Sequence, residues 1–137
     1  MKILIAHDGS EGAQKALDLA IDLAKRLRAK LHMIMVKEQL SFPTTLHDVA
    51  NAEEEASQRF EQVIAYAVAL ATKRRIAIEP HVVAGHPVPT IVEFIERDGF
   101  DLLVIGYMGH SAIYKGVIAS TTDRLVELAP CHVVVAK

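Results

Sequence analysis

The segment Ile3-Leu-Ile-Ala-His-Asp-Gly-Ser10 combines a short apolar run, a tight turn and a helix start. The apolar run has the length of a buried strand, and the Asp-Gly pair favours a turn. Ser10 is a good N-cap for an amphipathic helix that extends to about Arg28. This arrangement predicts a strand that leads directly into a helix, as in parallel α/β sheets.

The same alternation of apolar runs and helical patterns continues to the end of the chain. Further strands are expected at residues 31–36, 76–83, 102–105 and 132–136, and further helices at about 46–74, 87–98 and 120–128. The order β-α-β-α-β-α-β-α-β is typical of a doubly wound parallel sheet. Pro80 lacks a backbone N–H, so its strand belongs at an edge of that sheet. We expect residues 1–137 to form one domain.

Bulk composition excludes several classes of protein. The chain has 137 residues, 51% apolar and 23% charged, with a formal net charge of −2. A nucleic-acid surface needs a basic excess, and the basic clusters at 25–30 and 73–75 fall at expected helix ends instead. No apolar run approaches the roughly 20 residues that span a bilayer, and the single Cys131 cannot form an internal disulfide. We therefore expect a cytoplasmic protein without nucleic-acid or membrane partners.

A candidate binding site lies beyond the two wholly apolar strands, at residues 3–6 and 102–105. In an open α/β sheet, ligands bind past the carboxyl ends of the strands, where strand order reverses. Two loops would meet there, His7–Ser10 and Gly106–Ser120. Glycines let backbone N–H groups approach an anion, and the second loop opens a helix whose N-terminus attracts phosphate. From these residues alone, phosphate binding and an ordinary strand end with an N-cap both remain open.

The spacing within the second loop is more specific. Gly106 and Gly109 are followed by nine residues, a small residue and Ser120, which resembles the ATP loop of the universal stress protein family, G-x-x-G, nine residues, then G-[S/T]. The resemblance covers the whole chain. Residues 3–10 are similar to the family's first strand, residues 84–87 to its turn into the third helix, and residues 129–133 to its entry to the last strand. It implies a sheet of order 3-2-1-4-5.

The resemblance also implies how a ligand is held. Asp8 and the backbone of Val36 would hold the adenosine part of ATP or AMP, with Mg²⁺ arriving on the nucleotide. Four residues would hold the phosphates: Gly106, Gly109, Ser120 and Thr121. His7 and His110 flank this site and are candidates for a phosphate or base contact. The terminal strand often pairs with its copy in this family, so His132–Ala136 is the expected contact of a homodimer.

Position 119 departs from the family pattern, because it is Ala where ATP-binding members carry Gly. If the backbone there needs a positive φ, Ala costs roughly 1 kcal/mol or more, and its methyl group lies against the phosphate path. The main hypothesis is a regulatory module whose nucleotide changes its partner choice or dimer state. The alternatives are a family member that binds no nucleotide and a slow Mg²⁺-dependent ATP hydrolase using Asp8. No catalytic residue is assigned, because the loop offers only Lys115 as a cation and no second acidic ligand beside Asp8.

The remaining histidines and Cys131 are given no role in function. His32, His81 and His132 fall on expected strands, and His47 lies near the start of the long helix. None pairs at i, i+4 with a carboxylate or cysteine nearby, which is the local signature of a metal site. We interpret them as packing or surface residues and expect no metal site.

Overall fold

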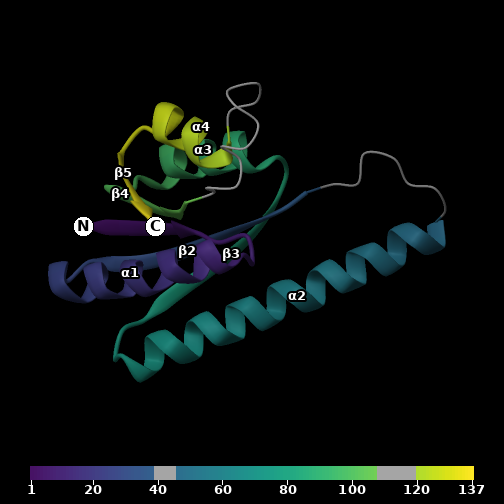
Figure 1. Ribbon diagram of the computed structural model, residues 1–137, viewed down its shortest axis with the longest axis horizontal. Coiled ribbons are helices and arrows are strands. Elements are labelled where there is room, and N and C mark those ends of the chain that lie inside the picture. The colour runs from purple at the N-terminus through teal and green to yellow at the C-terminus, as the bar shows by residue number, and fades with distance from the viewer. Residues whose placement is uncertain (39–45, 108–119) are drawn as a thin grey trace.

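The computed structural model describes residues 1–38, 46–107 and 120–137. Their elements, in chain order, are β1 (Lys2–Ala6), α1 (Glu11–Leu27), β2 (Lys30–Lys37), α2 (Leu46–Lys73), β3 (Ile78–Ala84), α3 (Pro87–Asp98), β4 (Leu102–Gly106), α4 (Thr121–Leu128) and β5 (His132–Ala136). The strands form one parallel sheet of order β3-β2-β1-β4-β5. Helices α1 and α2 lie on one side of it, and α3 and α4 on the other (Figure 1). The predicted fold class and strand order are confirmed.

The central strand β1 owes its position to side chains that are apolar on both faces. Ile3, Leu4 and Ile5 are all fully buried. Successive side chains of a strand point to opposite faces, so Ile3 and Ile5 join the core under α1 and α2. Leu4 joins the second core, under α3 and α4. Because β1 pairs with both β2 and β4, the strand order reverses between β1 and β4, as predicted.

Strand β3 lies at the edge that Pro80 requires, since it pairs only with β2 among the described strands. It begins at Ile78 rather than at the expected residue 76. The N–H of Ile76 donates to the carbonyl of Ala71 at 2.9 Å, and Arg75 adopts a left-handed φ of 61°. The turn that ends α2 therefore holds Ile76, and the strand begins two residues later than the apolar pattern predicts.

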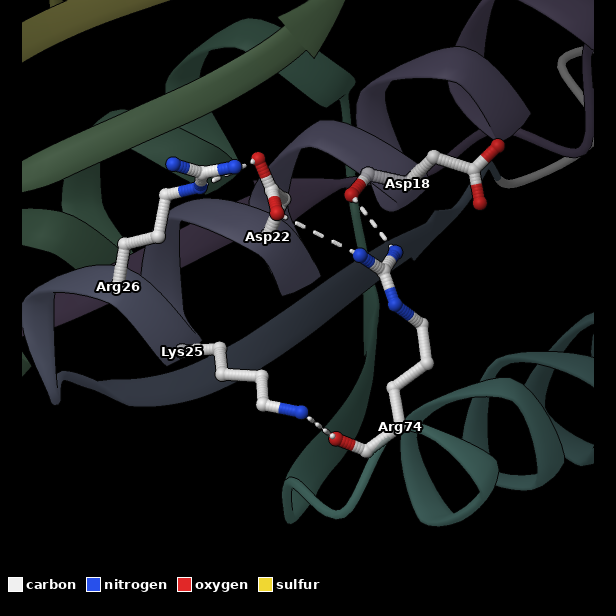
Figure 2. Close-up of polar contacts among 5 residues, drawn as sticks. All are labelled: Asp18, Asp22, Lys25, Arg26 and Arg74. Atoms are coloured by element: carbon white, nitrogen blue, oxygen red, sulfur yellow. Dashed lines mark hydrogen bonds and ion pairs between the residues drawn. The ribbon is translucent and has the colours of Figure 1, made fainter.

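The C-terminal end of α2 contacts α1 through a group of charged residues (Figure 2). The guanidinium of Arg74 donates to the carbonyl of Asp18 at 3.4 Å and pairs with the carboxylate of Asp22 at 3.5 Å. Asp22 also pairs with Arg26 at 3.1 Å, and Lys25 donates to the carbonyl of Arg74 at 3.0 Å. The basic clusters thus lie at helix ends, as predicted, and they also join two helices. No helix among the described residues is long and apolar enough to cross a membrane.

Candidate functional site

A cavity of about 870 Å³ opens past the carboxyl ends of β1, β2, β3 and β4. It is the position at which an open α/β sheet binds ligands. Five of the predicted site residues line it: His7, Asp8, Val36, Gly106 and Thr121. Ser120 stands next to Thr121 and is not among the residues of the cavity wall. Gly109, His110 and Ala119 lie outside the described residues.

His7 follows β1 directly and is only 3% exposed. Its Nδ1 accepts the backbone N–H of Gly9 at 3.0 Å, so the neutral ring carries its proton on Nε2. Burial lowers the pKa of His7 and outweighs the raising effect of Asp8, which favours that neutral ring. Within the described chain, the buried Nε2 has no hydrogen-bond partner. A buried unpaired donor costs roughly 1–3 kcal/mol, and a ligand acceptor in the cavity would remove that cost.

The turn after His7 holds Asp8 at the cavity. Gly9 adopts a φ of 86°, in the left-handed region that favours glycine. One carboxylate oxygen of Asp8 accepts the N–H of Ser10 at 2.9 Å. Ser10 in turn caps α1, since its hydroxyl oxygen accepts the N–H of Ala13 at 3.2 Å. The Asp8 carboxylate is therefore oriented by the backbone and keeps an exposed oxygen for a ligand hydroxyl group.

Gly106 has a structural reason to be glycine that needs no ligand. A Cβ at this position would lie 2.5 Å from the backbone carbonyl carbon and oxygen of Gly12. A Cβ on Gly12 would approach the carbonyl oxygen of Tyr107 to 3.1 Å. The end of β4 and the first turn of α1 thus pack backbone against backbone. This close approach brings Ser10 and Ala13 to the cavity wall.

The start of α4 supplies further polar groups. Ser120 is its N-cap, and its hydroxyl oxygen accepts the N–H of Asp123 at 3.1 Å. Thr122 is buried, lines the cavity and donates its hydroxyl proton to the carbonyl of Gly106 at 3.0 Å. That bond holds the helix start against the end of β4. Thr121 is exposed on the cavity wall, where its hydroxyl group is available to a ligand.

Sequence reasoning missed four charged residues of the cavity wall. Lys37 is the last residue of β2 and Glu38 follows it. Glu53 and Arg59 lie on α2. The site therefore has cations other than Lys115, which lies outside the described residues, and carboxylates other than Asp8. A usable signal existed in the sequence of α2, where small alanines four residues apart share one face of the helix. Ala52 and Ala56 both line the cavity.

Two histidines interpreted as separate packing residues meet each other and a carboxylate. His32 Nδ1 lies 3.0 Å from His81 Nε2 and 3.3 Å from a carboxylate oxygen of Glu79. The i, i+4 signature concerns ligands along a single element, whereas these three residues come from paired strands.

A family model described as the universal stress protein family matches residues 1–137. Universal stress protein YxiE of Bacillus subtilis is 25% identical over 145 residues, which cover 99% of this chain and 98% of the relative. Universal stress protein MJ0531 of Methanocaldococcus jannaschii is 28% identical over 139 residues, covering 99% of this chain and 81% of the relative.

Solved structures share this fold over the full length of the chain. UspA from Lactobacillus plantarum has a TM-score of 0.87 at 23% identity and covers 100% of this chain and 97% of its own. A universal stress protein in complex with cAMP has a TM-score of 0.82 at 24% identity, with coverages of 100% and 97%. An Arabidopsis thaliana family protein with AMP bound has a TM-score of 0.68 at 15% identity, with coverages of 100% and 92%. The chain belongs to the universal stress protein family.

Proposed function

We propose that residues 1–137 act as one adenine-nucleotide-binding domain, a regulatory module whose bound nucleotide alters its partner choice or dimer state. The observation that carries the proposal is the cavity at the strand-order reversal, whose lining includes His7, a buried residue with an unpartnered Nε2. Its volume of about 870 Å³ suits a nucleotide, since ligand pockets usually measure roughly 300–1,000 Å³. Two proteins of the same fold carry cAMP and AMP, which supports the choice of adenine nucleotides.

In this proposal the adenosine part lies at the ends of β1 and β2. The oriented carboxylate of Asp8 accepts hydrogen bonds from ribose hydroxyl groups, and the backbone of Val36 contacts the base. The Nε2–H of His7 donates to an acceptor atom of the nucleotide. These three groups lie on adjacent strand ends, so one ligand reaches them all.

The phosphates lie toward α4, at Gly106, Gly109, His110, Ser120 and Thr121. The free N–H groups and the dipole of a helix N-terminus favour an anion there. The described cavity wall adds two cations, Lys37 and Arg59, but it also carries three carboxylates: Asp8, Glu38 and Glu53. Because this wall has no positive excess, we expect ATP to bind with Mg²⁺ on its phosphates, whereas AMP needs no cation.

Strand β5 is the proposed dimer contact. It pairs with β4 and with no other described strand, so its outer edge has N–H and C=O groups available to a second copy. The neighbouring helix α4 exposes Val126 and Leu128, which adds apolar area beside that edge. We place this homodimer in the cytoplasm. Light scattering at increasing concentration tests the assembly. A Val135→Pro substitution, which removes an N–H from the outer edge of β5 and none from its pairing with β4, should lower the mass.

Calorimetry of nucleotide-stripped protein tests nucleotide binding. We expect AMP to bind, and ATP to bind more tightly with Mg²⁺ than with a chelator. Ser120→Asn keeps a good N-cap but removes the hydroxyl group, so it should weaken ATP more than adenosine. The absence of heat with AMP, ADP and ATP at millimolar concentration would contradict the proposal.

A further inference from the structure

Three side chains with metal-ligating atoms meet on the face of the sheet that α3 covers, in the first half of β2 and β3. His32 lies opposite Glu79 in the register of the two strands, and Ile34 lies opposite His81. Residues two apart on a strand share a face, so Glu79 and His81 point the same way as His32. We name these three residues the His-Glu-His cluster. One ligand atom from each lies within 4.8 Å of the others.

Two of the three distances in the cluster are close to the separation of neighbouring ligand atoms on a tetrahedral ion. Zinc binds imidazole nitrogen and carboxylate oxygen at about 2.0–2.2 Å, so two ligand atoms on a tetrahedral zinc lie roughly 3.3 Å apart. His32 Nδ1 lies 3.3 Å from the Glu79 oxygen and 3.0 Å from His81 Nε2. The two rings are nearly parallel, at 10° with centroids 5.3 Å apart, so Nδ1 and Nε2 face each other and the rings must rotate before both lone pairs converge on one ion.

The cluster has more lone pairs than protons to share between them. His32 Nδ1 carries at most one proton, while both of its neighbours, the Glu79 carboxylate and His81 Nε2, have lone pairs. If Nδ1 donates to Glu79, it cannot also satisfy His81 along a straight bond. If His81 donates to Nδ1 instead, the single lone pair of Nδ1 is used, and Nδ1 has no proton to donate to the carboxylate. A divalent cation removes this conflict, because all three atoms then act as ligands.

The surroundings pack against the two rings and leave the carboxylate exposed. His32 packs edge-on against Phe100 at a centroid distance of 5.2 Å, and His81 lies 4.9 Å from the Phe94 ring. The side chain of Glu79 is 65% exposed, against 14% for His32, so an ion has a path from solvent. The nearby Lys2 is directed elsewhere, because its ammonium donates to the carbonyl of Asp98 at 2.7 Å and lies over the Phe100 ring.

We propose that His32, Glu79 and His81 form a binding site for a divalent transition metal of the zinc class, separate from the nucleotide cavity. Imidazole and carboxylate ligands together suit Zn²⁺, whereas Mg²⁺ prefers a shell of oxygen atoms. Three protein ligands leave the fourth tetrahedral position to water. The ion would join the edge strand β3 to β2 through side chains as well as through the sheet.

Zinc titration of the full chain by calorimetry, without nucleotide, tests the site. We expect one Zn²⁺ per chain and no heat with Mg²⁺. Loss of a residue that only hydrogen-bonds to a metal ligand typically lowers metal affinity by roughly 10–100-fold. Glu79→Gln and His81→Gln each remove a ligand, so each should lower zinc affinity at least that much. Zinc should raise the Tm of the wild-type protein more than that of Glu79→Gln, and Co²⁺ should give the visible band of a tetrahedral site only when the cluster is intact.

His86→Gln is the matched control, because His86 is exposed and its side chain makes no capping bond to α3. It should bind zinc as the wild-type protein does. Glu79 is itself exposed, so its variant should fold even if His81→Gln does not. Equal zinc affinity in the wild-type and Glu79→Gln proteins would overturn the proposal, and so would the absence of zinc binding by the wild-type protein.

Discussion

The two ends of strand β2 carry opposite kinds of chemistry. At its carboxyl end, Val36 borders a cavity whose polar groups include N–H and hydroxyl donors. In its first half, His32 belongs to a cluster of lone pairs from two imidazoles and a carboxylate. We have proposed a nucleotide for the first region and a metal cation for the second.

The two regions also differ in what makes them. The cavity depends on backbone geometry: a strand-order reversal, a left-handed Gly9 and a close approach at Gly106. The cluster depends on three side chains brought together by register. Changes to the backbone should therefore damage the cavity, while changes to side-chain ends should damage the cluster and leave the fold intact.

The largest effect is expected from Gly106→Ala. The new methyl group would lie 2.5 Å from backbone atoms of Gly12, which cannot rotate away as a side chain could. Overpacking of this kind typically destabilises by 1–3 kcal/mol, and we expect a loss at the upper end, about 3 kcal/mol, in the free energy of unfolding by urea. AMP affinity should fall as well, because the end of β4 and the start of α1 must move apart.

Gly99→Ala is the control for this experiment. Gly99 has a φ of 72° but no atom within 4 Å of an added Cβ. Its substitution should cost only the strain of a positive φ, about 1 kcal/mol, with AMP affinity unchanged. Equal losses of stability in the two variants would refute the packing argument for Gly106.

The second prediction concerns the buried donor of the cavity. His7→Leu removes Nε2–H, and a hydrogen bond to an uncharged acceptor is worth about 0.5–1.5 kcal/mol, so AMP affinity should fall by roughly two- to tenfold. Calorimetry would measure this, with His86→Leu as a control that retains full affinity. Unchanged AMP binding by His7→Leu would remove His7 from the site.

Sequence reasoning was accurate where a property is local or repeats along one element. The apolar β1, the cap at Ser10 and the edge position of Pro80 follow from neighbouring residues, and all three are confirmed. The meeting of the His7 and Gly106 segments at one cavity follows from a general rule of α/β sheets.

The features that the sequence did not predict depend on contacts between distant segments. His32 and His81 are 49 residues apart, and only the register of β2 with β3 brings them together. Arg59 reaches the cavity because of where α2 packs, which its own helical pattern does not specify. Gly106 looked like part of a phosphate loop, but the structure shows a steric need that no spacing rule reveals.

The third prediction uses pH to separate the buried histidine from the exposed ones. Burial lowers the pKa of His7 in the folded state, so between that value and its ordinary value of about 6.5 the unfolded chain binds more protons. Stability from His7 is thus fully present above about pH 6.5 and is lost as pH falls through the folded-state pKa. One such group changes the free energy of unfolding by at most about 1.4 kcal/mol per pH unit.

Urea unfolding between pH 5 and pH 7.5 would measure this dependence in the wild-type and His7→Leu proteins. His32 also has its pKa lowered by burial, so both proteins should lose stability in acid. The His7 variant should lose less. Identical pH profiles would show that His7 keeps its ordinary pKa in the folded protein.

The smallest effect is expected for coupling between the two regions. His32 and Val36 are four residue steps apart on β2. At about 3.3 Å per step this is roughly 13 Å, beyond the roughly 7–10 Å over which substitutions usually interact. AMP and zinc should therefore bind additively, each changing the affinity for the other by less than about twofold. Calorimetric titration of AMP with and without zinc would measure this, with Glu79→Gln as the zinc-free comparison. A larger, zinc-dependent change in AMP affinity that Glu79→Gln abolishes would mean that β2 transmits binding from one end to the other. The two ends of the strand would then form one coupled site.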